Sequence, residues 1–346
     1  MSNTLKPIVS VILPNYNHGR YLKKRVHSIL NQTFQDFELI ILDDASTDNS
    51  IDIIEEYKQN TKVSCIDVNT VNSGSTFKQW SKGIQLAKGR FIWIAESDDF
   101  ASDDFLNLAV RAMESESSVD LVYCDSYIVD EKNEILGLSS TNKNDFFKTN
   151  KWSNHYLAEG RKELIGFLLT RTTINNASAV LFRKDCLSRQ KYLDNLVKFK
   201  NLGDLYTYST VLLTGNILYL NYPLNSMREH PMNTTKLNHK NGLIYYERVL
   251  FYLDIIDEIF LTPATTEEIL KLRESALSII YRNFSHLLTF GYYDNLKSLL
   301  NKFRYYKLIG WKRRKVLLLL FKLYNFRILK LNSFSGRAIK YLCIAN

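Results

Sequence analysis

Short apolar runs alternate with amphipathic stretches over the first 130 residues of the chain. The run at 8–13 is nearly continuous and rich in β-branched residues, which is typical of a strand buried on both faces. Similar runs predict further strands over 37–42, 63–68, 90–95 and 120–125. Apolar residues at helical spacing predict helices between them, over 21–32, 50–59, 76–87 and 103–114. This alternation predicts an α/β fold with a mostly parallel sheet flanked by helices.

The pattern changes twice after residue 130. Residues 131–176 are more polar and irregular, and we expect a long excursion there. A strand over 177–182, a helix over 204–213 and a short strand over 217–220 are predicted to follow. From residue 238 onward the pattern is helical. We therefore expect one domain over 1–237, with 1–130 and 131–237 as distinct parts, and a helical C-terminal domain over 238–346.

Composition narrows the class of protein. The chain has 346 residues, of which 45% are hydrophobic and 23% charged, as expected of a folded globular protein. Its four cysteines include no CxxC pair, which argues against a zinc cage or a disulfide framework and fits a reducing cytosol. No secretory signal is evident, and no apolar run approaches the ~20 residues that span a bilayer. We therefore expect a cytoplasmic protein that does not cross a membrane.

Positive charge is concentrated towards the C-terminus. From residue 238 onward there are 18 Lys and Arg against 8 Asp and Glu, and no acidic residue follows Asp294. A region of one sign favours a polyanionic partner. Anionic lipid, nucleic acid and a diphosphate-bearing ligand all fit this charge. The structural alternative is a helical bundle whose basic side chains face water.

Polar residues follow the predicted strands at their carboxyl ends, where parallel sheets bind ligands. The first strand runs into Pro14-Asn15-Tyr16-Asn17, and the chain contains neither GxGxxG nor a P-loop, the two commonest phosphate-binding motifs. Asp43 and Asp44 follow the second strand. Helix capping explains Thr47 or Asp48 better than this pair, because two adjacent buried carboxylates repel and lose hydration. A ligand that offers N–H or hydroxyl donors would offset that cost, so we expect Asp44 to bind one.

The fourth predicted strand leads directly into an acidic run, Glu96-Ser97-Asp98-Asp99. Three acids in four residues favour a metal site over the structural alternative, a capped turn before the next helix. Hard oxygen ligands suit Mg²⁺ or Mn²⁺, which proteins usually hold through one or two carboxylates together with substrate phosphates. The sequence therefore predicts a divalent cation site here.

Taken together, the motifs have a specific order. They are PNYN at 14–17, DDASTDNS at 43–50, NSG at 72–74, KGRFI at 88–92 and ESDD at 96–99. In order and spacing this set resembles the family 2 glycosyltransferases, strongly over 6–130 and more loosely over 177–235. The resemblance implies the GT-A fold and transfer of a sugar with inversion. It makes 1–130 the nucleotide-binding part and 131–237 the acceptor-side part.

The resemblance also implies roles for individual residues. Binding of the nucleotide-sugar is expected of Pro14, Tyr16, Asn17, Asp44, Asn72, Lys78, Glu96 and Asp98. Metal ligands are expected among Asp98, Asp99 and His230, and Glu96 stands where the family usually has its first Asp. The general base is expected to be Asp204, at the start of a helix, although Gly203 replaces the Glu that often precedes it. Without the resemblance, helix capping would be the simpler explanation of Asp204.

The predicted function is that of an inverting glycosyltransferase in cell-surface polysaccharide biosynthesis. The expected donor is a nucleotide-sugar, with a UDP-sugar favoured, and the expected cofactor is Mn²⁺ or Mg²⁺. The acceptor would be a saccharide or a lipid-linked oligosaccharide, whose hydroxyl proton Asp204 removes during a single direct displacement. The basic region at 311–321 is then expected to rest on anionic lipid at the inner face of the plasma membrane.

Other functions fit parts of the sequence. A sugar nucleotidyltransferase would keep the acidic metal site but would not need Asp204 as a base. A nucleic-acid-binding protein would use the C-terminal charge, but the region has no readout motif, so no nucleic acid partner is expected. A glycoside hydrolase uses two carboxylates without a nucleotide pocket. A processive membrane synthase is disfavoured because spanning helices and a QxxRW motif after Asp204 are absent.

Overall fold

The chain forms two compact units in the computed structural model, which describes residues 6–230, 242–310, 315, 317 and 318. The first unit contains Met1–Arg161 and Thr173–Pro231. The second contains Lys162–Thr172 and Met232–Asn346. The segment Lys162–Thr172 was expected to belong to the irregular excursion of the first domain. In the structure this segment groups with the helical part of the chain instead.

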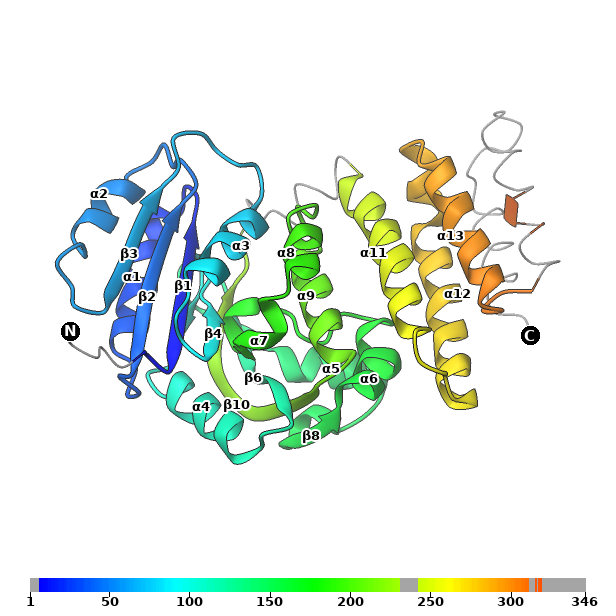
Figure 1. Cartoon of the computed structure of the whole chain (residues 1–346), viewed down its shortest axis with the longest axis horizontal. Coiled ribbons are helices and arrows are strands. Elements are labelled where there is room, and N and C mark those ends of the chain that lie inside the picture. Colours follow the sequence, from blue (N-terminus) through cyan, green and yellow to red (C-terminus); the bar gives the residue numbers. More distant parts are fainter. Residues whose placement is uncertain (1–5, 231–241, 311–314, 316, 319–346) are drawn as a thin grey trace. The chain divides into compact units, whose positions relative to one another are not determined.

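One mixed sheet organises the first unit (Figure 1). Its strands are β1 (Val9–Asn15), β2 (Phe37–Asp43), β3 (Val63–Val68), β4 (Phe91–Ile94), β5 (Phe100–Ala101), β6 (Val119–Val129), β7 (Ile135–Leu138), β8 (Tyr156–Glu159), β9 (Val180–Arg183) and β10 (Asn216–Arg228). The order across the sheet is β3-β2-β1-β4-β9-β6-β10-β5, with β7 beside β6 and β8 beside β10. The strands from β3 to β4 run parallel, β9 is antiparallel to both its neighbours, and β10 is parallel to β6. The predicted α/β fold is confirmed, and the expected parallel arrangement holds for β3, β2, β1 and β4, whereas β5, β7, β8 and β9 pair antiparallel with their neighbours.

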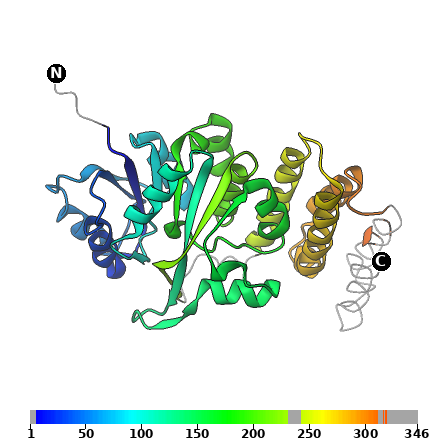
Figure 2. The same cartoon turned by 90° about the horizontal axis from the view of Figure 1, so that it is seen from below.

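Helices of the first unit lie on both faces of this sheet (Figure 2). They are α1 (Gly19–Leu30), α2 (Ser50–Glu55), α3 (Thr76–Leu86), α4 (Phe105–Ser115), α5 (Ser139–Phe147), α7 (Lys184–Leu187), α8 (Gln190–Leu196) and α9 (Gly203–Leu212). The short helix α6 (Gly160–Glu163) begins in the first unit and ends in the second. Short 3₁₀ turns occupy Lys151–Ser153 and Ala177–Ala179. The α1, α2 and α4 helices cover one face, and α3 packs on the other.

Strand β1 shows why both faces are needed. All seven of its residues are buried. Val11 and Leu13 share a core cluster with Val26 and Ile29 of α1. Ile12 points to the opposite face, which α3 covers. Full burial of each such aliphatic side chain contributes ~1.5–3 kcal/mol, so a β-branched strand covered on both sides anchors the fold.

Several elements differ from their predicted lengths. The strand expected at 217–220 continues to Arg228 as β10, past Pro223. Proline is tolerated there because the pairing with β6 shifts register around Pro223, so no ladder hydrogen bond is required of its nitrogen. The strand expected at 177–182 begins as a 3₁₀ turn and becomes β9 only at Val180. The excursion at 131–176 contains short elements of its own, among them β7 and α5.

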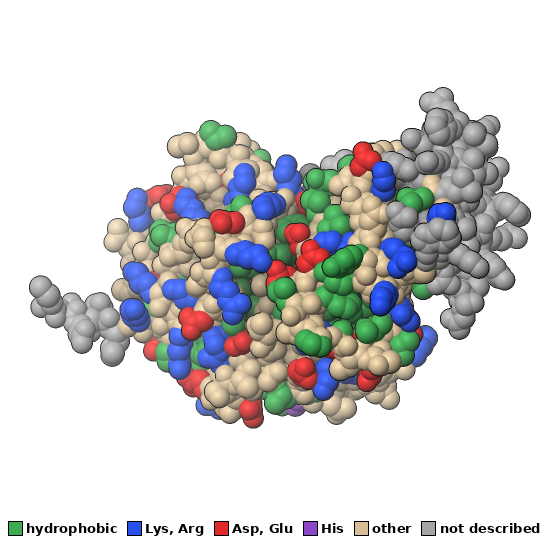
Figure 3. Space-filling view, turned by 45° about the vertical axis from the view of Figure 1, so that its right-hand side comes forward, with side chains coloured by type: hydrophobic (Ala, Val, Ile, Leu, Met, Phe, Trp, Pro, Cys, Tyr) green, Lys and Arg blue, Asp and Glu red, His purple; other side chains and the backbone are tan. Residues whose placement is uncertain are grey.

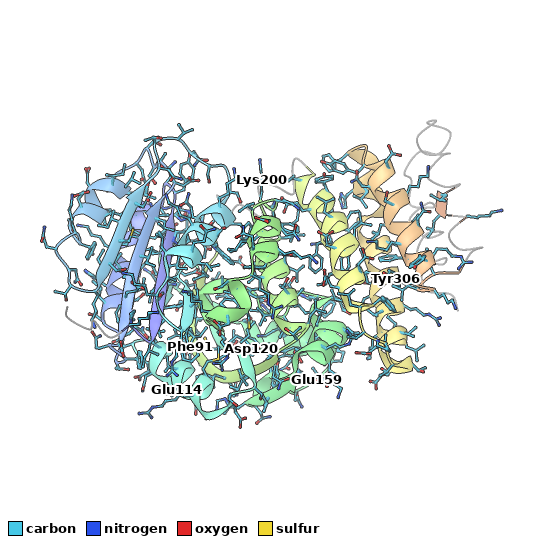
Figure 4. The ribbon with its side chains drawn as sticks, viewed as in Figure 1. Phe91, Glu114, Asp120, Glu159, Lys200 and Tyr306 are labelled. Atoms are coloured by element: carbon cyan, nitrogen blue, oxygen red, sulfur yellow. The ribbon has the colours of Figure 1, made fainter. Side chains whose placement is uncertain are left out.

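The two ends of the sheet are chemically different. Phe91, at the start of β4, and Asp120, near the start of β6, lie at the amino-terminal edge, whereas Lys200 before α9 lies at the opposite end (Figure 4). An ion pair between Arg183 and Asp120, 3.1 Å long, belongs to the amino-terminal edge. The motifs PNYN, DDASTDNS and ESDD, which stand at the carboxyl ends of the strands, are therefore separated from this amino-terminal edge by the length of the strands.

The described part of the second unit is helical, as predicted. A short π-helix over Leu164–Leu168 directly follows α6. Three longer helices are α11 (Leu243–Ile259), α12 (Thr266–Thr289) and α13 (Tyr293–Tyr305). The Tyr252 hydroxyl donates to the Leu169 carbonyl, which ties α11 to the π-helical segment.

Charge is balanced over residues 243–310 of this unit. Residues 243–310 contain 8 Lys and Arg and 8 Asp and Glu, and Figure 3 shows basic and acidic side chains interspersed over the face it displays. The basic region expected to contact lipid, 311–321, lies almost entirely outside the described residues. Within the part of the chain that the structure describes, no helix is both long and apolar enough to cross a bilayer.

Gly89, in the turn before β4, has no room for a side chain. A Cβ atom there would lie 2.5 Å from the Ser10 backbone nitrogen and 2.7 Å from the Val9 carbonyl carbon. We expect Gly89→Ala to lower the free energy of unfolding by about 1–3 kcal/mol, measured by urea denaturation. Gly137→Ala in β7 is the control, because nothing lies within 4 Å of a Cβ there. Equal stability of the two variants would contradict this packing.

Candidate active site

The ends of β1 and β2 lie side by side at the carboxyl edge of the sheet. Their register pairs Asn15 with Asp43. Asp43 is fully buried, and its Oδ1 accepts a hydrogen bond from the Ser46 backbone nitrogen at 2.7 Å. Its Oδ2 accepts from Ser46 Oγ and Asn15 Nδ2, both at 2.7 Å. Asp43 therefore holds the turn after β2 in place.

Asp44 is also saturated with donors of the protein itself. Its Oδ1 accepts from Asn69 Nδ2 at 2.6 Å, Gln79 Nε2 at 2.8 Å and the Ser73 backbone nitrogen at 2.9 Å. Its Oδ2 accepts from Ser73 Oγ at 2.8 Å, and Asn72 Nδ2 donates to its carbonyl. Donors of the protein itself therefore offset the cost of placing this acid pair together. The role of Asp44 in binding the nucleotide-sugar stays a prediction. It requires hydrogen bonds from the loop at 69–75 to be replaced by hydrogen bonds from the ligand.

The remaining predicted nucleotide-binding residues surround the same edge. Pro14 is buried in β1, and Tyr16 is 45% exposed just beyond it. Asn17 has a left-handed backbone, with φ of 55°, and its Oδ1 accepts from the Thr47 nitrogen at 2.7 Å, so it supports the turn after β2. Lys78 Nζ is exposed and donates to the Ser73 carbonyl at 2.8 Å.

Glu96 opens the acidic run after β4 and is bound from α3. Its Oε1 accepts a hydrogen bond from Trp80 Nε1 at 2.7 Å. Its backbone nitrogen donates to Ser178 Oγ at 3.1 Å. Burial, reinforced by the charge of Asp98, raises the pKa of Glu96 to about 8. This carboxyl group is therefore mainly protonated at neutral pH.

Asp99 faces the interior and is held by the neighbouring segments. Its Oδ1 accepts from the Arg228 backbone nitrogen at 2.9 Å, and its Oδ2 accepts from Asn176 Nδ2. Burial and the charge of Asp98 raise its pKa to about 6. These contacts anchor the acidic loop to the end of β10.

Asp98 lies with two imidazoles instead. Asp98 Oδ2 is 3.2 Å from His230 Nε2, and one ligand atom each from His18, Asp98 and His230 lie within 4.8 Å of one another. His18 Nδ1 is 2.8 Å from Ser97 Oγ, which orients its ring. The structure thus brings together two of the three predicted metal ligands, Asp98 and His230. Asp99 is not in this group.

Protonation states in this group favour cation binding. Burial alone would raise the pKa of Asp98, but the hydrogen bond with His230 and the charges of both histidines lower it. Burial lowers the pKa of His18. An ionised carboxylate beside a neutral imidazole is the form in which both residues ligate a divalent metal.

His18 was not among the predicted site residues. It follows PNYN directly and begins the approach to α1, so the sequence placed it in a turn. His18 is far from the acidic run along the chain, so the sequence did not indicate a contact between them. The available signal was its position at the carboxyl end of a predicted parallel strand, because such ends meet at one edge.

Arg25 supplies a buried counter-charge to the acidic run. Its guanidinium group is 4.9 Å from the centre of the Trp93 ring and has no solvent exposure. Burial lowers the pKa of Arg25 to about 10, while the charges of Asp99, Glu96 and Asp98 act in the opposite direction. It therefore remains a cation at neutral pH and stabilises negative charge in the loop.

Asp204 stands in the first turn of α9. Its Oδ1 accepts from the Leu205 backbone nitrogen at 2.7 Å, so the carboxylate serves an N–H of the first helical turn, as the capping alternative expected, and its role as the base stays a prediction. Gly203 replaces the expected Glu because a Cβ atom there would lie 2.5 Å from Cγ of Phe77. Burial raises the pKa of Tyr208, and the charges of Asp204 and Asp99 add to this effect. The predicted base and the acidic run thus act on one buried side chain.

Comparison with known proteins identifies the family. The family model described as Glycosyl transferase family 2 matches residues 10–188. The uncharacterized glycosyltransferase MJ1057 of Methanocaldococcus jannaschii is 34% identical over 149 residues, which are 42% of this chain and 51% of that protein. The chain therefore spans about half the length of that relative. TarS of Staphylococcus aureus, a poly(ribitol-phosphate) β-N-acetylglucosaminyltransferase, is 34% identical over 113 residues, 32% of this chain and 19% of that protein.

Solved structures support the same fold. TarS 1–349 in complex with UDP-GlcNAc superimposes with a TM-score of 0.61 and 18% identity, covering 97% of this chain and 89% of that chain. The mannosyltransferase PcManGT from Pyrobaculum calidifontis, in complex with GDP-Man and Mn²⁺, gives a TM-score of 0.51 and 14% identity, covering 98% of this chain and 86% of that chain. At these identities the likeness concerns the fold alone.

The structural role of Asp43 is testable by stability. Asp43→Asn replaces a carboxylate oxygen with an amide donor that faces Ser46 and Asn15. We expect the free energy of unfolding to fall by about 1–3 kcal/mol, measured by urea denaturation. Asp52→Asn, at an exposed position of α2, is the matched control and should stay within about 0.5 kcal/mol of the unmodified protein. An Asp43→Asn protein as stable as the unmodified protein would contradict this structural role of Asp43.

Proposed function

Because the chain belongs to glycosyl transferase family 2, we propose that it transfers a sugar from a nucleoside diphosphate to a saccharide hydroxyl with inversion. The observation that carries the proposal is the group formed by His18, Asp98 and His230, close to the end of the strand that leads into the acidic run. A single displacement needs stabilisation of the leaving diphosphate and a base on the opposite side of the anomeric carbon. This group and Asp204 would supply these two parts.

The donor set fits a divalent cation. Two imidazoles and one ionised carboxylate suit Mn²⁺ better than Mg²⁺, because Mg²⁺ takes oxygen ligands almost exclusively. The separation of 3.2 Å between His230 Nε2 and Asp98 Oδ2 is compatible with adjacent ligands of one ion. When bound, the cation would neutralise charge on the departing nucleoside diphosphate. The presence of Mn²⁺ in the PcManGT complex supports this choice.

The remaining residues would position the donor. A protonated Glu96, fixed by Trp80, offers a neutral hydroxyl to the ribose side of the donor. Asp99 would hold the loop through Asn176 and the Arg228 backbone, so that Asp98 stays with the imidazoles. Tyr16, exposed beside the carboxyl edge, is suited to stack on the nucleobase.

Among donors we favour a UDP-sugar. The TarS structure with UDP-GlcNAc supports this choice, since it superimposes better than the structure with GDP-Man. The acceptor is proposed to be a saccharide or a lipid-linked oligosaccharide of a cell-surface polymer, in keeping with the named activity of TarS on a poly(ribitol-phosphate). Asp204 would remove the acceptor proton as its oxygen attacks.

Metal and donor binding can be measured together. We expect titration calorimetry to show UDP binding that Mn²⁺ strengthens, because Asp98 then shares a cation with the diphosphate. Asp98→Ala should abolish this dependence on Mn²⁺, and His18→Ala should weaken it. Asp103→Ala, an exposed acid after the same loop, should bind as the unmodified protein does. UDP affinity that is indifferent to Mn²⁺ in the unmodified protein would contradict the metal site.

The base is tested by turnover. We expect Asp204→Asn to lower kcat about 10²–10⁴-fold while leaving UDP affinity unchanged, because the amide cannot accept the acceptor proton. The measurement is release of nucleotide from a panel of UDP- and GDP-sugars with simple saccharide acceptors. Release of nucleoside diphosphate is expected. Release of inorganic diphosphate from a nucleoside triphosphate and a sugar 1-phosphate, in a parallel assay, would indicate a nucleotidyltransferase instead. Near-normal turnover by the variant would remove Asp204 from the mechanism.

A further inference from the structure

Tyr208 lies one helical turn after Asp204 on α9. Residues four apart share a helix face, and long side chains lean towards the helix N-terminus, so the Tyr208 side chain is directed towards the turn that carries Asp204. Its ring is fully buried and stacks on Phe182 of β9, with ring centres 6.2 Å apart and planes 9° from parallel. The ring position is thus fixed by the sheet.

The hydroxyl of Tyr208 has no hydrogen-bond partner among the described residues, although it is buried. Two other hydroxyls of the same helix have partners: Thr207 Oγ1 is 2.9 Å from Tyr192 Oη, and Thr210 Oγ1 donates to the Tyr206 carbonyl. The buried Ser209 Oγ also lacks a partner among the described residues, but Ser209 follows Tyr208 directly and is not four residues from Asp204. Leaving a buried polar group unsatisfied costs about 1–3 kcal/mol. A hydroxyl that serves only packing would be replaced by phenylalanine at no loss.

This hydroxyl is within electrostatic range of three carboxyl groups. Asp204 exerts the largest charge effect on it, followed by Glu96, with a smaller effect from Asp99. These residues come from α9 and from the loop after β4. Burial, reinforced by negative charge on that side, raises the pKa of Tyr208, so the phenol stays protonated and can donate to a carboxylate. Tyr192, the other titratable group acting on it, is itself paired with Thr207.

We propose that the Tyr208 hydroxyl is a positioning group for the base, donating a hydrogen bond to the Asp204 carboxylate when the acceptor is bound. This would fix one carboxylate oxygen and leave the other towards the acceptor hydroxyl. The bond would be absent from the ligand-free protein, which is the state with the unpartnered hydroxyl. The inference rests on the proposed function, since it assigns Tyr208 to the step in which Asp204 removes a proton.

The test compares two buried tyrosines. We expect Tyr208→Phe to lower kcat about tenfold, because hydrogen bonds to charged groups are the stronger ones, and to leave KM for the UDP-sugar unchanged. Its melting temperature should equal or exceed that of the unmodified protein. Tyr192→Phe removes a hydroxyl that has a partner, so it should lower the melting temperature and leave kcat unchanged.

The outcomes separate the inference from the proposed function. Unchanged kcat in Tyr208→Phe, with an active unmodified protein, would overturn the role of Tyr208 alone. A melting temperature lowered as much as in Tyr192→Phe would show that the hydroxyl has a structural partner, and would also overturn it. If the unmodified protein releases no nucleotide from any UDP- or GDP-sugar, the proposed function fails and the inference falls with it.

Discussion

Burial of carboxyl groups at the end of β4 is the constraint on which the rest of the site depends. Three acids within four residues would repel one another and lose hydration, so each has a different compensation. Glu96 is held protonated beside Trp80, and Asp99 accepts from a backbone nitrogen and an amide. Asp98 is ionised between imidazoles. The buried Arg25 adds a cation beneath the loop. Together these contacts permit one partly buried charge, on Asp98, whose side chain keeps 21% of its surface accessible.

The acidic residues of this region differ in how many hydrogen bonds their carboxylates already accept from the protein. Both carboxylate oxygens of Asp43 accept hydrogen bonds from the protein, and these bonds close the turn after β2. Asp44 is similarly occupied, so a nucleobase must compete with Ser73 and Gln79 for it. Among the described residues, the side chain that pairs with the Asp98 carboxylate is the His230 imidazole, a partner that a cation can share. Proximity in sequence to a motif therefore says less about role than the number of donors each carboxylate already accepts.

Much of the fold was predictable from the sequence, and less of the site. The β-branched run at 8–13 and its successors fixed the parallel half of the sheet, because only strands buried on both faces have that composition. Pro223 concealed the length of β10, since its tolerance depends on the register against β6. His18 and Asp98 are far apart in the chain, and a contact between two loops leaves no periodicity to detect. The choice between Asp98 and Asp99 likewise depends on which way each side chain turns.

Two departures from the family pattern meet at the same place. Glu96 stands where the family usually has Asp, and its longer side chain reaches Trp80 of α3. Gly203 stands where Glu often precedes the base, and the space a side chain would need there is filled by Phe77 of α3. Phe77 and Trp80 pack edge to face with ring centres 5.0 Å apart. Because both departures contact one aromatic pair, they are best understood as a single packing solution that joins α3 to the acidic loop and to the start of α9.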